Sequence, residues 1–227
     1  MVRLKEWMKY VIIGVCFFTG IGLGLSGMAV VAMGDKAQSE ENKVEPVKVA
    51  LLGDSITAGY GGNPYDETMQ EKLGVGYKVL NFGESGASAS SWGALPYTDT
   101  PSYDALREEH ADIIMIQLGT NDTACWLDDS SFKQSYTKLM QNCKDTGARV
   151  ILVTPPKAYD VSGDYGVVGE RLELIAYTIQ KLAEDNGMTV VDLYSASDES
   201  WLASDGVHLN SYGAQRVGEL MAEGVTK

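Results

Sequence analysis

Five short apolar segments recur along the chain, and longer amphipathic segments separate them. The apolar segments span residues 47–52, 78–82, 113–118, 150–153 and 189–193. Most are nearly continuous in Val, Ile and Leu, which is typical of strands that are covered on both faces. Strand and helix therefore alternate, and this alternation predicts a parallel sheet with helices on both sides.

Three segments have the clearest helical character: 131–146, 168–186 and 211–223. In the second, Leu and Ile recur at spacings of three and four residues, as on the buried side of an amphipathic helix. The pattern predicts a doubly wound α/β fold in a single domain, and 227 residues with 44% hydrophobic content suit one core of ordinary size. In such folds ligands bind beyond the carboxyl ends of the strands.

The charge balance argues against one class of partner. The formal net charge is −13, and Lys and Arg are not clustered. A surface that binds nucleic acid needs clustered positive charge against the phosphates. We therefore expect no nucleic-acid partner.

The first 46 residues differ from the rest. Basic residues within 1–9 precede an uncharged stretch, 10–33, that is long enough to cross a bilayer and also contains the small-residue pattern of a cleavage site, Val30-Val31-Ala32. We interpret 1–33 as a signal anchor or signal peptide, 34–46 as a polar linker ending at Pro46, and 47–227 as the α/β domain. The basic N-terminus predicts that the body is exported, and so is extracellular or held at the membrane by this segment.

Two cysteines, Cys125 and Cys143, lie outside that stretch. Export permits a disulfide between them, but two cysteines do not make a framework, and we favour free thiols. Neither has a histidine nearby in the sequence, so the spacing typical of zinc ligands is absent and no metal site is expected.

Small and polar residues follow the predicted strands where a ligand should bind. These blocks read Gly53-Asp54-Ser55, Gly83-Glu84-Ser85-Gly86, Gly119-Thr120-Asn121-Asp122 and, farther from its strand, Asp205-Gly206-Val207-His208. A serine becomes a nucleophile when an imidazole takes its proton and a carboxylate holds that imidazole. Ser55 is the candidate nucleophile, His208 the base, and Asp205 the residue that orients the base.

Acyl transfer also needs donors for the oxyanion of the tetrahedral intermediate. The N–H groups of Ser55 and Gly86 and the side-chain amide of Asn121 are the candidates, because all three follow strands whose ends converge. Taken singly, Ser55 is more typical of a helix N-cap, Gly86 of a turn, Asn121 of an Asx turn and His208 of the surface. Together, at the ends of the right strands, they favour a catalytic site. His110 does not belong to any of these blocks and is expected at the surface.

These blocks resemble the SGNH hydrolases, also called the GDSL esterase and lipase family, over about 47–223. In that family the serine of "GDSIT" is the nucleophile, which corresponds to Ser55. The second block supplies an oxyanion glycine, here Gly86 with Gly83 as the less favoured register, and "GTND" supplies Asn121. "DGVHL" supplies Asp205 and His208. The resemblance implies a three-layer α/β/α sandwich with a five-stranded parallel sheet of flavodoxin-like topology. It also implies hydrolysis of esters or thioesters without a metal or an organic cofactor.

An exported esterase meets glycans first, so the expected reaction is O-deacetylation of a carbohydrate. Trp92, Tyr97, Trp126 and Trp201 are candidates to stack on sugar rings, with packing in the core or at its rim as the alternative. A lipase, lysophospholipase or acyl thioesterase is the alternative enzyme and would need an apolar acyl channel. A non-catalytic module that binds glycan or protein is the third possibility, although it has no need of Ser55 and His208 together.

Overall fold

A five-stranded parallel sheet runs through the structure, a computed structural model that describes residues 45–227. The strands are β1 (Val47–Gly53), β2 (Tyr77–Gly83), β3 (Ile113–Gln117), β4 (Arg149–Val153) and β5 (Val190–Val191). Their order is β2-β1-β3-β4-β5, and every neighbouring pair is parallel. This is the flavodoxin-like order, and it confirms the predicted fold class.

The expected signal segment 1–33 and nearly all of the linker 34–46 lie outside the described residues. Within 45–227, no helix combines the length and apolar character that a bilayer crossing requires.

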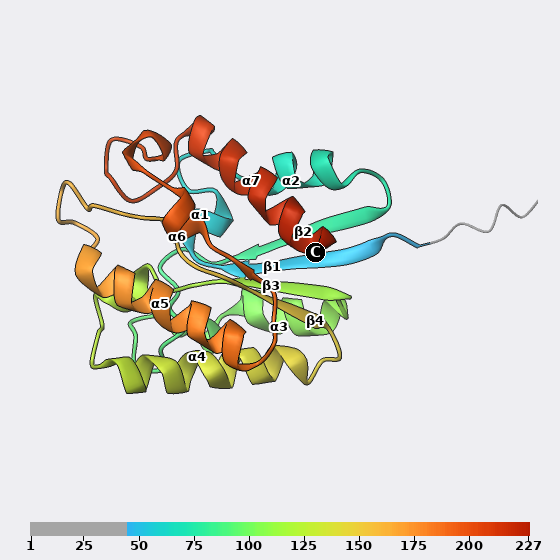
Figure 1. The fold of residues 1–227 in the computed structure, drawn as a ribbon, viewed down its shortest axis with the longest axis horizontal. Helices are drawn as coiled ribbons and strands as arrows, with labels where there is room; N and C mark the ends of the chain where they lie inside the picture. The colour runs from blue at the N-terminus through green and yellow to red at the C-terminus, as the bar shows by residue number, and fades with distance from the viewer. Residues whose placement is uncertain (1–44) are drawn as a thin grey trace, which may run out of the picture. The chain divides into compact units, whose positions relative to one another are not determined.

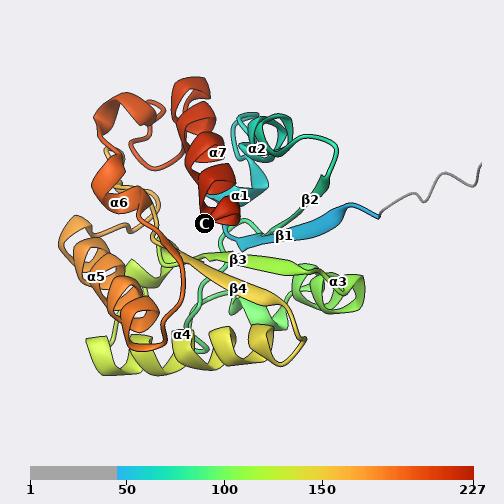
Figure 2. The ribbon, with the colours of Figure 1, turned by 45° about the vertical axis from the view of Figure 1, so that its right-hand side comes forward.

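Helices cover both faces of the sheet (Figures 1 and 2). On one face lie α1 (Ser55–Ala58), α2 (Asp66–Leu73) and α7 (Ser211–Thr226). On the other face lie α3 (Pro101–Glu109), α4 (Asp129–Lys144) and α5 (Gly169–Asp185). A short helix, α6 (Leu193–Ala196), follows β5, and three single 3₁₀ turns occur at Tyr97–Asp99, Asn121–Thr123 and Glu199–Trp201.

The two helical layers explain why the middle of each central strand is apolar. Successive side chains of a strand point to opposite faces. In β1, Ala50 and Leu52 pack toward α3, α4 and α5, whereas Val49 and Leu51 pack toward α2 and α7, and all four are fully buried. From Val49 to Leu52, neither face of β1 therefore offers a position for a polar side chain.

The helix boundaries follow from side-chain caps. Asp128 accepts a hydrogen bond from the Ser131 N–H at 2.7 Å and starts α4 two residues before the predicted position. Asn210 accepts one from the Gly213 N–H at 2.9 Å and starts α7 where the sequence predicts it. Such caps satisfy N–H groups that have no partner within the helix.

The predicted last strand, 189–193, is too long. Only Val190–Val191 pair with β4. Asp192 accepts a hydrogen bond from the Ser195 N–H at 3.1 Å and so begins α6 in place of extending the strand.

Two glycines let α1 sit directly on the strand ends. A Cβ on Gly53 would lie 1.9 Å from the Thr57 hydroxyl oxygen, and a Cβ on Gly83 would lie 2.2 Å from the Ala58 backbone nitrogen. A side chain at either position would push α1 off the sheet. The first residue of α1 is Ser55, so these glycines fix the position of the candidate nucleophile.

Candidate active site

The side chains of Ser55, His208 and Asp205 form one continuous series of hydrogen bonds. His208 Nε2 lies 3.0 Å from Ser55 Oγ, and His208 Nδ1 lies 2.8 Å from Asp205 Oδ2. Ser55 and His208 are almost fully buried, with 8% and 4% of their surface exposed. This is the arrangement in which a carboxylate orients an imidazole and the imidazole takes the proton of a serine.

The turn that carries Asp205 and His208 is held by its own backbone. Asp205 Oδ1 accepts hydrogen bonds from the N–H groups of Val207 (2.9 Å) and His208 (3.0 Å), and Ala203 N–H donates to the His208 carbonyl at 2.8 Å. Gly206, between them, has φ +74°, a conformation that favours glycine. The base and its orienting carboxylate are therefore fixed as one unit.

These contacts also set the charge of Asp205. Partial burial alone would raise its pKa, but the N–H of Val207 and the interactions with His208 outweigh burial and leave the pKa below its ordinary value. Asp205 is therefore ionised at neutral pH and can stabilise the imidazolium that forms on His208.

Ser55 follows β1 and opens α1, but it is not the N-cap. Asp54 takes that position, and its Oδ1 accepts a hydrogen bond from the Ile56 N–H at 2.9 Å. Asp54 is fully buried, and burial raises its pKa to about 7. Because Asp54 satisfies the cap, the Ser55 hydroxyl is free to face His208.

The candidate oxyanion donors come from three strand-end loops. Within the described chain, the N–H groups of Ser55 and Gly86 donate to no other group. Gly86 is exposed and has φ +83°, with open space where a Cβ would be. Asn121 Nδ2 donates to the Ala87 carbonyl at 2.9 Å, and the second hydrogen of this amide stays available.

Gly83 is less suited to the oxyanion role. Its N–H donates to Asn81 Oδ1 at 2.9 Å, and its Cα faces the backbone of α1. The geometry therefore favours the Gly86 register that the sequence indicates.

Asp122 fastens the loop after β3 to the loop after β2. Its carboxylate is fully buried and accepts hydrogen bonds from the N–H groups of Ala89 (3.0 Å) and Ser90 (2.8 Å) and from the Ser90 hydroxyl (2.5 Å). Burial raises the pKa of Asp122, and these donors partly oppose that rise. Sequence reasoning missed this role, although Asp122 directly follows Asn121 in the same block.

The aromatic residues expected to stack on sugar include two that are buried. Tyr97 is in the core, where its hydroxyl donates to the Phe82 carbonyl at 2.6 Å, and Trp201 packs in the opposite core. These two residues follow the alternative that the sequence left open, packing in the core, and their buried rings cannot stack on a sugar. Trp92 and Trp126 are partly buried, and Trp92 Nε1 donates to the Cys125 carbonyl at 2.9 Å.

The aromatic rings that do lie beside the site are Tyr60 and Tyr165. Their ring centroids are 4.2 Å and 5.0 Å from that of His208. Tyr60 follows α1, within reach of the "GDSIT" block, so proximity in sequence could have indicated it. Tyr165 belongs to the loop between β4 and α5, and nothing in the sequence connects it to His208.

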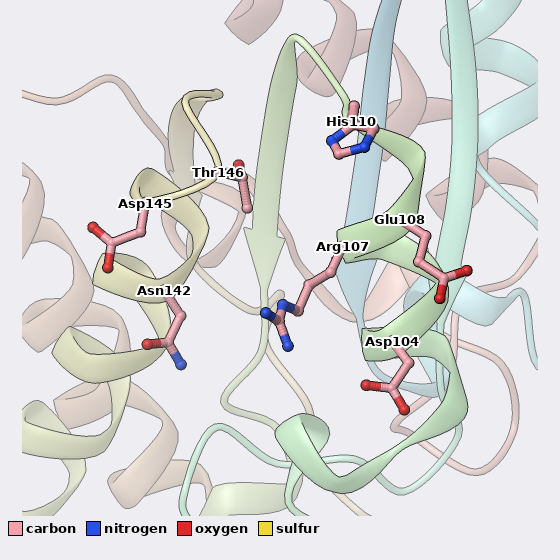
Figure 3. A pocket seen from close by; sticks show the side chains of 7 residues that line it. All are labelled: Asp104, Arg107, Glu108, His110, Asn142, Asp145 and Thr146. Carbon is pink, nitrogen blue, oxygen red and sulfur yellow. The ribbon is translucent and has the colours of Figure 1, made fainter. Parts of the chain in front are cut away.

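A surface cavity lies away from the candidate site. It has a volume of about 860 Å³ and is lined by residues of α3 and α4 and the turns after them, and Figure 3 shows the Arg107 side chain reaching into it from α3. His110 at its rim is exposed, as predicted. The helices that line this cavity end where β3 and β4 begin, whereas Ser55 and Asn121 follow the carboxyl ends of their strands. The cavity therefore lies at the opposite edge of the sheet from the candidate site.

Both cysteines within residues 45–227 are free thiols, as favoured from the sequence. Burial raises the pKa of Cys143 to about 12 and also raises that of Cys125. Elevated pKa values keep both thiols protonated and weakly nucleophilic, so Ser55 is the nucleophile candidate that the geometry favours.

Comparison with known proteins gives a family and a fold. The model of the GDSL-like Lipase/Acylhydrolase family matches residues 51–216. An acetylxylan esterase of Xylanibacter ruminicola is 26% identical over 211 residues, covering 81% of this chain but only 44% of the relative, so the chain spans less than half the length of that protein. An arylesterase of Vibrio mimicus is 24% identical over 196 residues, covering 79% of this chain and 88% of the relative.

A similar fold occurs in a solved structure. The carbohydrate acetylesterase Est24 of Sinorhizobium meliloti superimposes with a TM-score of 0.66 over 79% of this chain and 98% of that one, at 22% identity. At 22% identity, this similarity shows that the two proteins share a fold.

Proposed function

The chain belongs to the GDSL-like lipase/acylhydrolase family, a family of ester-hydrolysing enzymes, and on that premise we propose that it is a serine esterase that removes acetyl groups from a carbohydrate. The observation that carries the proposal is the series of hydrogen bonds from Ser55 through His208 to Asp205. A buried serine, an imidazole at 3.0 Å and an ionised carboxylate behind it have the geometry of nucleophile, base and orienting group.

In the first half of the reaction, Ser55 Oγ attacks the acyl carbonyl while His208 Nε2 takes its proton. The carbonyl oxygen becomes an oxyanion, which the N–H groups of Ser55 and Gly86 and the Asn121 amide bind. Asp205 stabilises the imidazolium through Nδ1. The intermediate then collapses: the bond from carbon to the alcohol oxygen breaks, and His208 donates its proton to the leaving alcohol.

In the second half, water replaces the alcohol. His208 takes a proton from the water as its oxygen attacks the acyl-serine, and the same donors bind the second oxyanion. When this intermediate collapses, Ser55 Oγ leaves with the proton from His208 and the carboxylic acid is released. The cycle restores every group and consumes one water for each ester.

Support for a carbohydrate substrate comes from the relatives and from the site. One relative is named an acetylxylan esterase, and a protein of the same fold is named a carbohydrate acetylesterase. Two exposed tyrosines, Tyr60 and Tyr165, stand beside the candidate base. Aromatic rings at the rim of a site suit a ligand that has both apolar and hydroxyl-bearing surfaces.

The proposal includes a location. The uncharged segment 10–33 after basic residues supports export of the domain, which is either secreted or held at the membrane by that segment. An exported esterase has acetylated glycans within reach, whereas acyl-CoA is confined to the cytoplasm.

The test is a substrate series with the purified full-length chain. We expect release of acetate from acetylated xylan or another acetylated glycan, and a steep fall in rate from 4-nitrophenyl acetate through butyrate to octanoate. Ser55→Ala is the control for contaminating esterases. Activity that rises toward octanoate would assign the protein to lipid or thioester hydrolysis, and a folded wild type without any Ser55-dependent turnover would contradict an esterase.

A further inference from the structure

Two tyrosine rings that are exposed to solvent lie against the imidazole of His208. The Tyr60 ring lies 4.2 Å from it, tilted by 33°, and the Tyr165 ring lies 5.0 Å from it, nearly perpendicular at 80°. His208 is 4% exposed, but Tyr60 is 51% and Tyr165 36% exposed. The two rings therefore cover the imidazole and present surface of their own to a ligand.

The backbone around both tyrosines is joined to the turns that carry the catalytic groups. The Tyr60 N–H donates to the Ser55 carbonyl at 3.0 Å. Tyr165 belongs to the loop 154–168, in which the N–H of Tyr159 donates to the Gly206 carbonyl at 2.7 Å and the N–H of Val161 to the Asp205 carbonyl at 3.0 Å. Both rings are therefore placed relative to Ser55 and His208 by hydrogen bonds of the main chain.

The loop is fastened at its other end too. The Val168 N–H donates to Thr123 Oγ1 at 3.3 Å, and Arg171, in the first turn of α5, donates to the Thr123 carbonyl at 2.8 Å. Thr123 belongs to the loop after β3, which also carries Asn121. Tyr165 thus extends from a segment that is attached on both sides of the active site.

The direction of proton transfer says which part of an ester meets these rings. His208 gives its proton to the oxygen of the leaving alcohol, so this oxygen must lie within hydrogen-bond reach of Nε2. The acyl oxygen instead faces Gly86 and Asn121. Groups that flank His208 therefore contact the alcohol part of the substrate.

The charges around the rings favour a neutral alcohol. Partial desolvation, the neighbouring Tyr60 hydroxyl and, to a smaller extent, the carboxylates of Asp205 and Asp164 raise the pKa of Tyr165. Negative charge beside the rings disfavours a phosphate-bearing leaving group, such as the head group of a phospholipid or coenzyme A. A sugar carries no such charge, its C–H face can pack on an aromatic ring, and its hydroxyls can pair with phenols.

We propose that Tyr60 and Tyr165 form the leaving-group subsite of the enzyme and that this subsite binds the sugar ring whose ester is cleaved. The inference rests on the proposed esterase function and adds the residues that select its substrate. It predicts that the two tyrosines distinguish between alcohols, with the acyl group held constant.

The test compares two acetyl esters on the purified full-length chain: an acetylated xylo-oligosaccharide and ethyl acetate, whose alcohol has no ring. 4-Nitrophenyl acetate is unsuitable, because its aromatic leaving group can also stack on tyrosine. For Tyr60→Ala and Tyr165→Ala we expect kcat/KM on the oligosaccharide to fall about five- to tenfold more than on ethyl acetate, mainly through KM. Tyr60→Phe and Tyr165→Phe keep the rings and should retain most of the preference.

Tyr177→Ala is the matched control, because Tyr177 is 61% exposed on α5. It should change neither rate. If both alanine variants kept the wild-type ratio of the two kcat/KM values, the subsite would be overturned. Unchanged rates would mean that the rings do not contact the substrate, and equal losses on both esters would mean that they only position His208. A wild type that hydrolyses ethyl acetate but no acetylated sugar would contradict the proposed substrate itself, and the subsite with it.

Discussion

His208 Nε2 lies 3.0 Å from Ser55 Oγ, although 153 positions separate the two residues in the chain. Ser55 stands directly after β1, the first strand of the sheet, and His208 stands just before α7, the last helix. The contact forms only when the whole domain has folded, so catalytic activity reports on the complete fold.

Replacing Ser55 with alanine should lower kcat on 4-nitrophenyl acetate by at least ~10⁴-fold, because no other group can form the acyl-enzyme. The fold should survive, since the hydroxyl makes a side-chain hydrogen bond to His208 alone within the described chain. Ser91→Ala, at an exposed serine, is the control. Steady-state kinetics and circular dichroism are the measurements, and a folded variant with full activity would exclude Ser55 as the nucleophile.

Replacing Asn121 with alanine should lower kcat by about 10²–10³-fold with little change in KM, since an oxyanion donor acts mainly in the transition state. The variant also loses the hydrogen bond to the Ala87 carbonyl. Asn142→Ala, at the hollow between α3 and α4, serves as the comparison. If both variants kept the wild-type kcat, Asn121 would have no part in the oxyanion hole.

Asp122→Ala should destabilise the protein by about 3 kcal/mol, because three buried donors from Ala89 and Ser90 lose their acceptor. The loop that carries Gly86 would also lose its anchor, so kcat should fall. Urea denaturation gives the change in the free energy of unfolding, and Asp99→Ala, at an exposed aspartate, is the reference. Equal effects of the two substitutions would show that Asp122 does not hold the loop.

Asp54 makes stability depend on pH. Its carboxyl has an ordinary pKa near 3.8 when unfolded and about 7 when folded. Between these values unfolding releases a proton, so raising the pH from about 4 to about 7 favours unfolding, by up to ~4 kcal/mol for this group. Below about pH 4 the contribution of Asp54 to the free energy of unfolding is fully present, and above about pH 7 it is lost.

The Asp54→Asn variant removes this titration but keeps a capping oxygen for Ile56. The free energy of unfolding of the wild type should therefore decline relative to that of the variant across this pH range. Chemical denaturation at several pH values checks this, with Asp104→Asn on the exposed side of α3 as the control. A difference that stays constant with pH would contradict the buried, proton-binding Asp54.

The parallel sheet and the location of the site follow from features that the residues display, whereas the flavodoxin-like strand order is expected only from the family resemblance. Strand segments covered on both faces are apolar, and residues 49–52 of β1 are an example, with Val49 and Leu52 buried against opposite layers. Parallel strands bring their carboxyl ends to one edge, so their places in the sequence predict that Ser55 and Asn121 lie near each other.

Other features depend on contacts that leave no pattern in the sequence. Tyr165 reaches His208 because its loop bonds to the turn around Asp205, and a loop has no periodicity that would indicate this. Tyr97 and Trp201 stand near sequence blocks of the site, but packing turns both rings into the core. β5 is likewise shorter than predicted because the Asp192 side chain caps α6, which ends the strand at Val191.

The loop between β4 and α5 has one part that contacts the substrate's alcohol in the proposed subsite and another that is attached to the catalytic turns. Tyr159 and Val161 in its middle are bonded to the turn of Asp205 and Val168 at its end is bonded to Thr123, whereas the tip between them, residues 162–165, is exposed and contains the turn glycine Gly163. Changes in length or composition at the tip need not disturb these bonds. A library of variants restricted to this tip would therefore search for new alcohol specificities while the hydrolytic machinery stays constant.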